Sequence, residues 1–258
     1  MRPFTLIAGP CLIEDEEVAL HIATYVKELC AELDMEYVFK GSFKKANRTS
    51  IDSKMGIGDE DALKILARVG KELDLKTLTD IHESHEADLA AEYVDVLQIP
   101  AFLCRQTELL LAAGRTGKVV NIKKGQFLSP EAMRFPKEKV ESTGNHQVWL
   151  TERGTTFGYN ELIVDATAIA RLKELQSKVI MDCTHATQKP NRTQGTTGGD
   201  PSMIGTLALS AVATGADGLF IETHPDPATA GSDSATMLQM DALRSLLIKV
   251  NKVRSAGI

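Results

Sequence analysis

The chain has 258 residues, of which 43% are hydrophobic and 25% are charged, and its formal net charge is −6 at pH 7. This composition is typical of a globular protein with a large core, and the absence of runs of like charge gives no electrostatic basis for binding nucleic acid or a membrane surface. No apolar run approaches the length of a membrane span, and the N-terminus lacks the pattern of a signal peptide, so we expect a cytoplasmic protein.

Eight short segments rich in β-branched and aromatic residues recur along the chain and predict strands. They are 4–8, 36–40, 75–79, 95–99, 118–122, 147–151, 178–182 and 218–222. The intervening segments carry apolar residues at helical spacing, most clearly at 16–33, 60–73 and 161–175, and the last helix is expected at 237–254.

Eight strand–helix units without a linker or composition shift predict a single (β/α)8 TIM barrel over residues 1–258. A doubly wound open sheet is the alternative. That fold carries a glycine-rich fingerprint after its first strand, and the segment here, GPCLIE, does not supply one. Two connections rich in small polar residues, 189–202 and 223–234, follow the last two predicted strands and are candidate lids.

Polar or charged residues stand at or just after the end of every predicted strand, where barrel enzymes build their sites. Six of them are basic and come from four strand–helix units: Lys40, Lys45, Arg48, Arg105, Lys123 and Arg153. Like charges repel, so their convergence in an acidic protein predicts a bound polyanion, with phosphate and carboxylate as the natural candidates. Any one of them, taken alone, is equally compatible with a solvated strand end.

A second group combines Cys11, His185, Glu222 and Asp233. Barrel closure makes the first, seventh and eighth strands neighbours, and a thiol, an imidazole and two carboxylates suit Zn²⁺, Fe²⁺ or Mn²⁺. Scattered ligands form no motif, however, and Cys11 is also compatible with a small buried hydrophobic residue. The other cysteines, Cys30, Cys104 and Cys183, are spaced too widely for a disulfide framework, and all four are expected to be reduced thiols.

Several blocks of the sequence closely resemble those of the 3-deoxy-D-manno-octulosonate 8-phosphate synthase family. The blocks cover nearly the whole chain: IAGPCLIE (7–14), FKGSFKKANRTS (39–50), TDIHE (79–83), QIPAFLCRQT (98–107), NIKKGQF (121–127), ERGTTFGYNELIVD (152–165), DCTHATQ (182–188) and GLFIETHPDP (218–227). FLCRQT and ERGTTFGYN are specific to this family rather than to barrels in general.

The resemblance implies a homotetrameric enzyme that condenses phosphoenolpyruvate with D-arabinose 5-phosphate, releases phosphate and serves lipopolysaccharide synthesis. It implies that the carboxylate side of phosphoenolpyruvate is held by Lys40, Ser42, Lys45 and Gln98. It assigns the phosphate to Arg105, Lys123, Arg153 and the backbone of Ala101. Asn47, Arg48 and Thr49 match the segment that takes the arabinose phosphate, partly across a subunit boundary. The implied substrate site also includes Asp80 and Gln188, and the expected catalytic residues are Lys40, Lys45, Lys123, Arg153 and His185.

The family contains a metal-dependent and a metal-independent class, which differ at the position of Cys11, where the metal-free class has asparagine. Cys11, with His185, Glu222 and Asp233 in register, is similar to the metal-dependent class, which implies a divalent metal cofactor. One departure is that Asp200 and Pro201 follow Gly198-Gly199, where many relatives have arginine.

Two other functions are compatible with a barrel of this kind. One is the related condensation that uses erythrose 4-phosphate and makes 3-deoxy-D-arabino-heptulosonate 7-phosphate; the ANRTS block (46–50) favours the longer sugar. The other is a catalytically inactive barrel that senses phosphorylated sugars, against which all the strand-end lysines are present.

Overall fold

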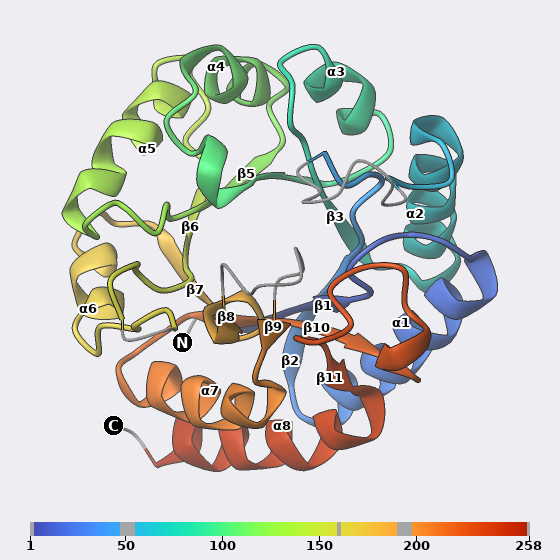
Figure 1. Ribbon diagram of the computed structural model, residues 1–258. Coiled ribbons are helices and arrows are strands. Elements are labelled where there is room, and N and C mark those ends of the chain that lie inside the picture. Colours follow the sequence, from blue (N-terminus) through green and yellow to red (C-terminus); the bar gives the residue numbers. More distant parts are fainter. Residues whose placement is uncertain (1–2, 47–54, 159–160, 190–197, 257–258) are drawn as a thin grey trace.

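The protein is a closed barrel of eight parallel strands inside a ring of helices, as seen in a computed structural model that describes residues 3–46, 55–158, 161–189 and 198–256 (Figure 1). The barrel strands are β1 (Phe4–Gly9), β2 (Met35–Lys40), β3 (Lys76–Asp80), β4 (Val96–Ile99), β5 (Val119–Lys123), β6 (Val148–Glu152), β7 (Lys178–Asp182) and β10 (Gly218–His224). Pairing of β1 with β10 closes the ring. The predicted TIM barrel is therefore confirmed, and the open doubly wound sheet is excluded.

One helix follows each barrel strand. The helices are α1 (Glu16–Glu32), α2 (Asp59–Leu73), α3 (Glu86–Ala91), α4 (Thr107–Arg115), α5 (Arg134–Glu141), α6 (Ala168–Lys173), α7 (Ile204–Ala213) and α8 (Met240–Ser255). Three short strands lie in the connections: β8 (Gln188–Lys189) pairs with β9 (Gly198–Gly199), and β11 (Leu238–Gln239) pairs in parallel with the end of β10. Single 3₁₀ turns occupy η1 (Ala101–Leu103), η2 (Glu131–Met133), η3 (His185–Thr187), η4 (Pro201–Met203) and η5 (Pro227–Thr229).

The helix predicted at 161–175 is wrong in its first half, since α6 begins only at Ala168. Ile163 forms an antiparallel bridge with Thr155, which takes the backbone away from helical geometry. Asp165 then accepts hydrogen bonds from the backbone and hydroxyl of Thr167, both at 2.8 Å, so its side chain competes with helix formation just before α6. The first half of this segment is mostly exposed, and Ile163 is 49% exposed, so its apolar spacing does not reflect a buried helical face.

The second candidate lid, 223–234, lies within the described residues, whereas the first, 189–202, is only partly described. Residues 190–197 of the first, like the predicted sugar-phosphate segment Asn47, Arg48 and Thr49, lie outside the described residues. In the described part of the first lid, Asp200 caps η4 by accepting a hydrogen bond from the backbone of Ser202 at 3.2 Å, with Pro201 at the first position of the turn. Asp200 and Pro201, which stand where many relatives have arginine nearby, therefore stabilise the start of η4.

An apolar cluster fills the middle of the barrel and receives one inward-facing residue from each strand. Its members are Ile7, Val38, Leu78, Val96, Val119, Trp149, Ile180 and Phe220. A larger cluster packs the outer faces of the strands against the helices. Because side chains alternate along a strand, the residues two positions beyond each member of the inner cluster also face inward, one layer nearer the C-terminal rim. None of the helices in the described ranges is long and apolar enough to cross a membrane.

Candidate active site at the C-terminal rim

The layer directly above the apolar cluster is almost entirely polar. Strand alternation places there Lys40, Asp80, Gln98, Asn121, Thr151, Asp182 and Glu222, and all are buried. One step further, the same alternation adds Lys123 at the end of β5, and Cys11 and Arg153 just beyond the ends of β1 and β6. This layer sits where the strands of a barrel end and is the candidate active site.

Glycine occupies the position that β1 contributes to this polar layer. A Cβ atom at Gly9 would overlap the carbonyl oxygen of Lys40, so a side chain here would push β1 away from the end of β2. The close approach lets the Lys40 ammonium donate hydrogen bonds to the carbonyl oxygen of Cys11 at 2.8 Å and of Pro10 at 3.4 Å. The turn that carries Cys11 is thereby fixed over the barrel.

Cys11, Glu222 and Asp233 form a compact cluster at the β1–β10 seam. One ligand atom of each lies within 4.8 Å of the others, and the Cys11 thiol is 3.2 Å from Asp233 Oδ2. The thiol is also 3.2 Å from Ser232 Oγ, and the backbone of Gly231 donates to Glu14 at 2.8 Å. These contacts bind the loop after β10 to the turn after β1, so the cluster is assembled from both ends of the chain.

The donor set of this cluster fits a divalent cation. Oε2 of Glu222 is buried and has no hydrogen-bond partner, although a buried carboxylate oxygen is costly to leave unpaired. Burial, together with the charges of Asp233 and Glu222, raises the pKa of the Cys11 thiol, so protein groups alone keep it protonated. A cation would satisfy the orphaned oxygen and favour the thiolate.

His185 stands at the edge of this cluster. Its Nε2 atom lies 3.6 Å from Glu222 Oε2 and 3.5 Å from Asp233 Oδ2, while Nδ1 faces Asp182 Oδ2 at 2.8 Å. Burial would lower the pKa of His185, but the charges of Asp182 and Glu222 and the hydrogen bond with Asp182 together raise that pKa. Asp182 thus fixes the ring with Nε2 toward the cluster, as outer carboxylates orient metal-ligating histidines.

Two lysines of the rim are already paired with carboxylates. Lys40 Nζ donates to Glu222 Oε1 at 2.6 Å, and Lys123 Nζ donates to Asp182 Oδ2 at 2.7 Å while lying 3.8 Å from the ring centroid of Phe220. With its two carbonyl acceptors, Lys40 has a partner for each of its three N–H groups, so it can contact a ligand only by exchanging one of them.

Arg153 is the least satisfied cation of the rim. It is 5% exposed, and its Nη2 atom donates to Gln188 Oε1 at 2.6 Å, but its buried Nε and Nη1 atoms have no partner. Burial lowers the pKa of the guanidinium, and the charge of Asp182 is the largest effect that opposes this lowering. The buried, unpaired N–H groups of Arg153, together with Lys123, whose ammonium is paired with Asp182, are suited to an anion such as phosphate.

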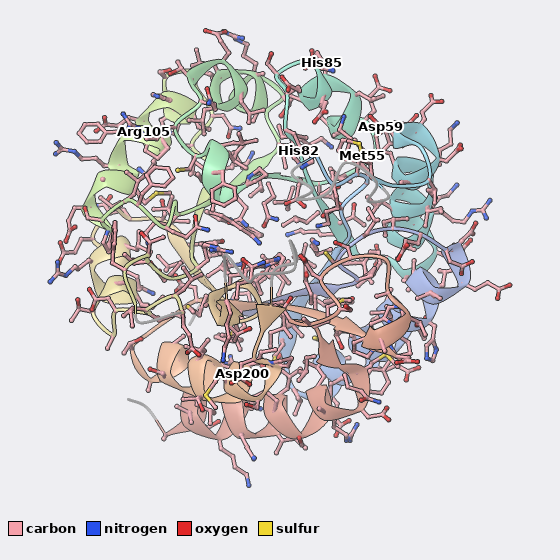
Figure 2. The ribbon with its side chains drawn as sticks, in the orientation of Figure 1. Met55, Asp59, His82, His85, Arg105 and Asp200 are labelled. Atoms are coloured by element: carbon pink, nitrogen blue, oxygen red, sulfur yellow. The ribbon has the colours of Figure 1, made fainter. Side chains whose placement is uncertain are left out.

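Most of the remaining predicted residues lie at the ends of β2, β3 and β4, whereas Arg105 lies away from the barrel axis. Lys45 donates to Ser42 Oγ at 2.8 Å, and Asp80 accepts hydrogen bonds from the hydroxyl of Ser42 and the amide of Gln98, which joins β2, β3 and β4. Ala101 is buried in η1 directly after β4. Arg105 is exposed, and Figure 2 places it over the outer ring of helices rather than at the barrel axis.

Several residues of the site were not predicted from the sequence. Asn121 and Thr151 continue the hydrogen-bond chain to β5 and β6, and Asp182 orients His185. Lys124 is 1% exposed and donates to the carbonyl oxygen of Gly154 at 3.1 Å, which joins the loops after β5 and β6. The available signal was strand alternation, since residues two beyond an inward apolar residue face the barrel interior.

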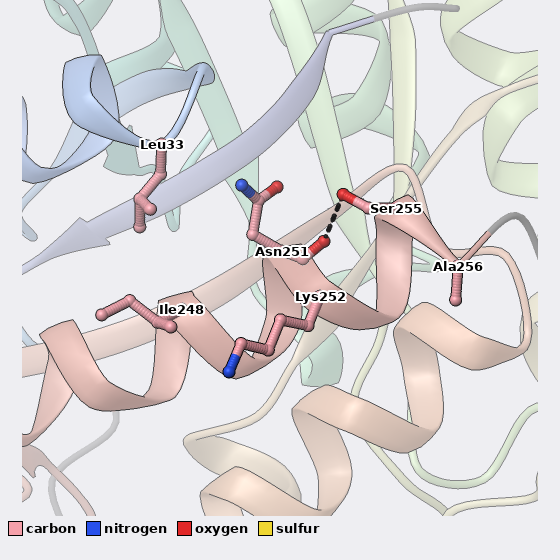
Figure 3. Close-up of a pocket in the computed structure, with 6 residues that line it drawn as sticks. All are labelled: Leu33, Ile248, Asn251, Lys252, Ser255 and Ala256. Carbon is pink, nitrogen blue, oxygen red and sulfur yellow. Dashed lines mark hydrogen bonds between the residues drawn. The ribbon is translucent and has the colours of Figure 1, made fainter.

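A shallow depression elsewhere on the surface is unrelated to this site. It is lined by Leu33, beyond α1, and by residues of the last turns of α8, where Ser255 donates to the Asn251 carbonyl at 2.9 Å (Figure 3). It contains no cluster of ionisable groups, so the polar rim is the stronger candidate.

The fold and rim together define an enzyme-like (β/α)8 barrel with an anion site beside a candidate cation centre. Residues 2–257 match the model of the DAHP synthetase I family. Three relatives are named 2-dehydro-3-deoxyphosphooctonate aldolase. That of Cyanothece sp. is 47% identical, and the match covers 99% of this chain and 93% of the relative; that of Syntrophotalea carbinolica is 51% identical, with 95% and 89% covered. That of Koribacter versatilis is 47% identical, with 97% of this chain and 91% of the relative covered. The chain belongs to this family of sugar-acid phosphate synthases.

Proposed function

We propose that the protein condenses phosphoenolpyruvate with D-arabinose 5-phosphate and water to give 3-deoxy-D-manno-octulosonate 8-phosphate and inorganic phosphate, a precursor of the lipopolysaccharide inner core. The observation that carries the proposal is the pair of unpartnered, buried N–H groups of Arg153 next to Lys123. The name of the aldolase relatives describes an eight-carbon product, which favours a five-carbon aldehyde over erythrose 4-phosphate.

The chemistry requires charge stabilisation at two ends of phosphoenolpyruvate. Its C3 attacks the aldehyde carbon while C2 becomes electron-deficient, and water then adds at C2. The tetrahedral species collapses by cleavage of the C2–O bond, and phosphate leaves with the bonding electrons. Fixed cations at the phosphate and carboxylate therefore stabilise charge as it develops without reorganising during the reaction.

The residues of the rim divide this work between them. Arg153 and Lys123, with the Ala101 backbone, are assigned to the phosphate. Lys45 and Ser42 are joined by a hydrogen bond and are assigned, with Lys40 and Gln98, to the carboxylate. Burial would lower the pKa of Lys45, but the charges of neighbouring groups, among them Glu222, Asp80 and Asp233, raise it, which supports a cationic role. The further assignments to the substrates are Asn47, Arg48, Thr49, Asp80, Arg105 and Gln188.

Cys11, His185, Glu222 and Asp233 are assigned as ligands of a divalent cation, Zn²⁺, Fe²⁺ or Mn²⁺. When bound, the cation supplies Lewis-acid polarisation and a template for orienting the acceptor sugar or the water. Lys40 neutralises Glu222 Oε1 and leaves Oε2 for the cation. Asp182 holds a proton on Nδ1 of His185 and so keeps Nε2 free to act as a ligand.

Phosphate release tests the proposed reaction. The protein is incubated with phosphoenolpyruvate and either arabinose 5-phosphate or erythrose 4-phosphate, and inorganic phosphate and the sugar-acid product are measured. We expect release with the five-carbon sugar. Release with only the four-carbon sugar would select the alternative condensation, and binding of both substrates without turnover would indicate the sensor.

Metal removal tests the cation centre. We expect a chelator to abolish most activity and Zn²⁺, Mn²⁺ or Fe²⁺ to restore it. Elemental analysis of Cys11→Ala should show loss of bound metal, whereas Cys30→Ala should retain it. Cys30 is a matched control because it is a buried thiol whose pKa is raised to about 12 by burial, with no carboxylate among the causes. Full activity of metal-free protein would contradict the assignment.

We also propose that the single catalytic domain assembles as a homotetramer in the cytoplasm. Large apolar side chains in the units after β4, β5 and β6 are exposed, and Phe157 is 99% exposed, which supports burial against another copy. The four cysteines are free, which is compatible with a reducing compartment. Light scattering should show a smaller assembly for Phe157→Asp than for Met203→Ser, an exposed apolar control on η4; equal masses would contradict this interface.

A further inference from the structure

A continuous chain of side-chain hydrogen bonds runs across the polar layer from β5 and β6 to β3. Thr151 donates to Asn121 Oδ1 at 2.7 Å, Asn121 Nδ2 donates to Gln98 Oε1 at 2.8 Å, and Gln98 Nε2 donates to Asp80 Oδ1. The strand register supports it, since Asp80 pairs with Gln98 and Gln98 pairs with Asn121. Asn121 and Thr151 are fully buried, as is Gln98 between them and Asp80.

The sense of the chain is fixed at its acidic end. Burial would raise the pKa of Asp80, but the charges of Lys40, Lys45 and Lys123 hold it well below its usual range, so Asp80 is an acceptor only. Gln98 must therefore present its NH₂ group to Asp80 and its oxygen to the neighbouring strand. Asn121 must then present its own NH₂ group to that oxygen.

Thr151 completes the orientation from the other end. The amide oxygen of Asn121 needs a donor, and the hydroxyl of Thr151 supplies one. If the Gln98 amide were inverted, its oxygen would face the Asp80 carboxylate and its NH₂ group would face that of Asn121. A contact between two acceptors and a contact between two donors would replace the two hydrogen bonds. In a buried site each unpaired group is costly.

We infer that Asn121 and Thr151 are positioning residues that fix the orientation of the Gln98 carboxamide and thereby aim its second amide proton at the carboxylate of phosphoenolpyruvate. The assignment of the ligand rests on the proposed function. The orientation of the carboxamide rests only on the geometry of the four side chains. The two parts can therefore be tested separately.

The orientation is tested without substrate. Hydrogen exchange of side-chain carboxamides is followed by NMR on protein labelled with ¹⁵N at Gln and Asn, comparing wild type with Thr151→Val, which is nearly isosteric but has no donor. We expect the Gln98 carboxamide to exchange faster in Thr151→Val and at the wild-type rate in Thr151→Ser, which keeps the hydroxyl. Thr77→Val is the control, because Thr77 is a buried strand residue at the opposite end of the barrel.

Kinetics test the consequence for the ligand. In Thr151→Val we expect the KM for phosphoenolpyruvate to rise about tenfold, the factor that corresponds to roughly 1.4 kcal/mol, while the KM for the sugar phosphate stays unchanged. Asn121→Asp places an acceptor opposite the amide oxygen of Gln98 and should raise the KM for phosphoenolpyruvate further. Thr151→Ser should restore the wild-type value, and Thr77→Val should match wild type.

The outcomes separate the inference from the proposed function. Unchanged exchange and KM in folded Thr151→Val, equal impairment of Thr151→Ser and Thr151→Val, or a parallel rise in both KM values would overturn the positioning role. If the wild-type protein does not condense the two substrates, the proposed function fails. The exchange rates then still decide whether Thr151 and Asn121 orient Gln98.

Discussion

The two ends of the barrel interior use charged residues in opposite ways. Two positions below the apolar cluster, Glu36 accepts hydrogen bonds from Lys178 and Thr5 at 2.8 Å and from Lys76 at 3.0 Å, so both its oxygens are paired. Two positions above the cluster, Glu222 leaves one oxygen buried and unpaired. Strand alternation creates both layers, but only the lower one is satisfied by the protein itself.

The difference shows which charges serve folding and which are held for a ligand. At the N-terminal end, charges neutralise one another where the strands begin, and Lys178 also lies over the Trp149 ring at 4.6 Å. At the C-terminal end, the unpaired atoms of Glu222 and Arg153 keep bonding capacity that the fold does not use. In such barrels the C-terminal end carries function and the N-terminal end carries stability. The contrast between unpaired and paired charges gives a physical reason for this division in the present protein.

Removing a structural charge at the upper end should give the largest effect. Lys124 and Glu152 are each 1% exposed and lie 3.5 Å apart, so Lys124→Met leaves a buried carboxylate without its cation. We expect a loss of about 3–5 kcal/mol in the free energy of unfolding. Urea denaturation measures it.

The double variant Lys124→Met/Glu152→Gln provides the control, because the amide of glutamine needs no counter-charge. It should recover part of the lost stability. An unchanged stability of Lys124→Met would show that this pair, unlike the charges below the apolar cluster, contributes nothing to the fold.

Removing an unpaired charge should affect activity rather than stability. Arg153→Met removes the buried guanidinium, and we expect kcat/KM to fall by about 100- to 1,000-fold, a change of roughly 2.7–4 kcal/mol. The melting temperature should stay the same or rise, because the two unpaired N–H groups are no longer buried. A large fall in melting temperature without a loss of activity per folded molecule would show that Arg153 serves folding rather than catalysis.

The smallest effect is expected at the lower end. Burial alone would raise the pKa of Glu36, but hydrogen bonds from two lysines and a threonine lower it to about 2. A lowered pKa stabilises the folded state above the unfolded value of 4.5, and this contribution disappears as the pH falls from about 5 toward 2. Screening by solvent keeps it below about 1 kcal/mol.

Glu36→Gln tests this contribution. The variant should be slightly less stable at pH 7, should lose less stability on acidification than wild type, and should keep its kcat. Denaturation midpoints at pH 7, 4 and 3 measure the difference. An identical acid dependence in the two proteins would contradict the role of Glu36.

The sequence predicted the architecture because hydrophobic periodicity and strand spacing are local properties. All eight barrel strands lie where they were expected. The helix at 161–175 was misplaced because Ile163 pairs with Thr155 in an antiparallel bridge and Asp165 competes for the backbone. Cys11 could not be distinguished from a core cysteine by pattern alone, since its neighbours Ser232 and Asp233 lie more than 200 positions away. Asn121 and Thr151 were missed because their partners are other side chains.

The pairing of β1 with β10 has a consequence for biosynthesis. Cys11 and Asp233 are separated by 222 positions, so the cluster of Cys11, Glu222 and Asp233 cannot form until nearly the entire chain has left the ribosome. A nascent chain that ends before Glu222 presents Cys11 without the two carboxylates of the cluster. If the proposed cation binds there, the order of synthesis delays its binding until the barrel closes.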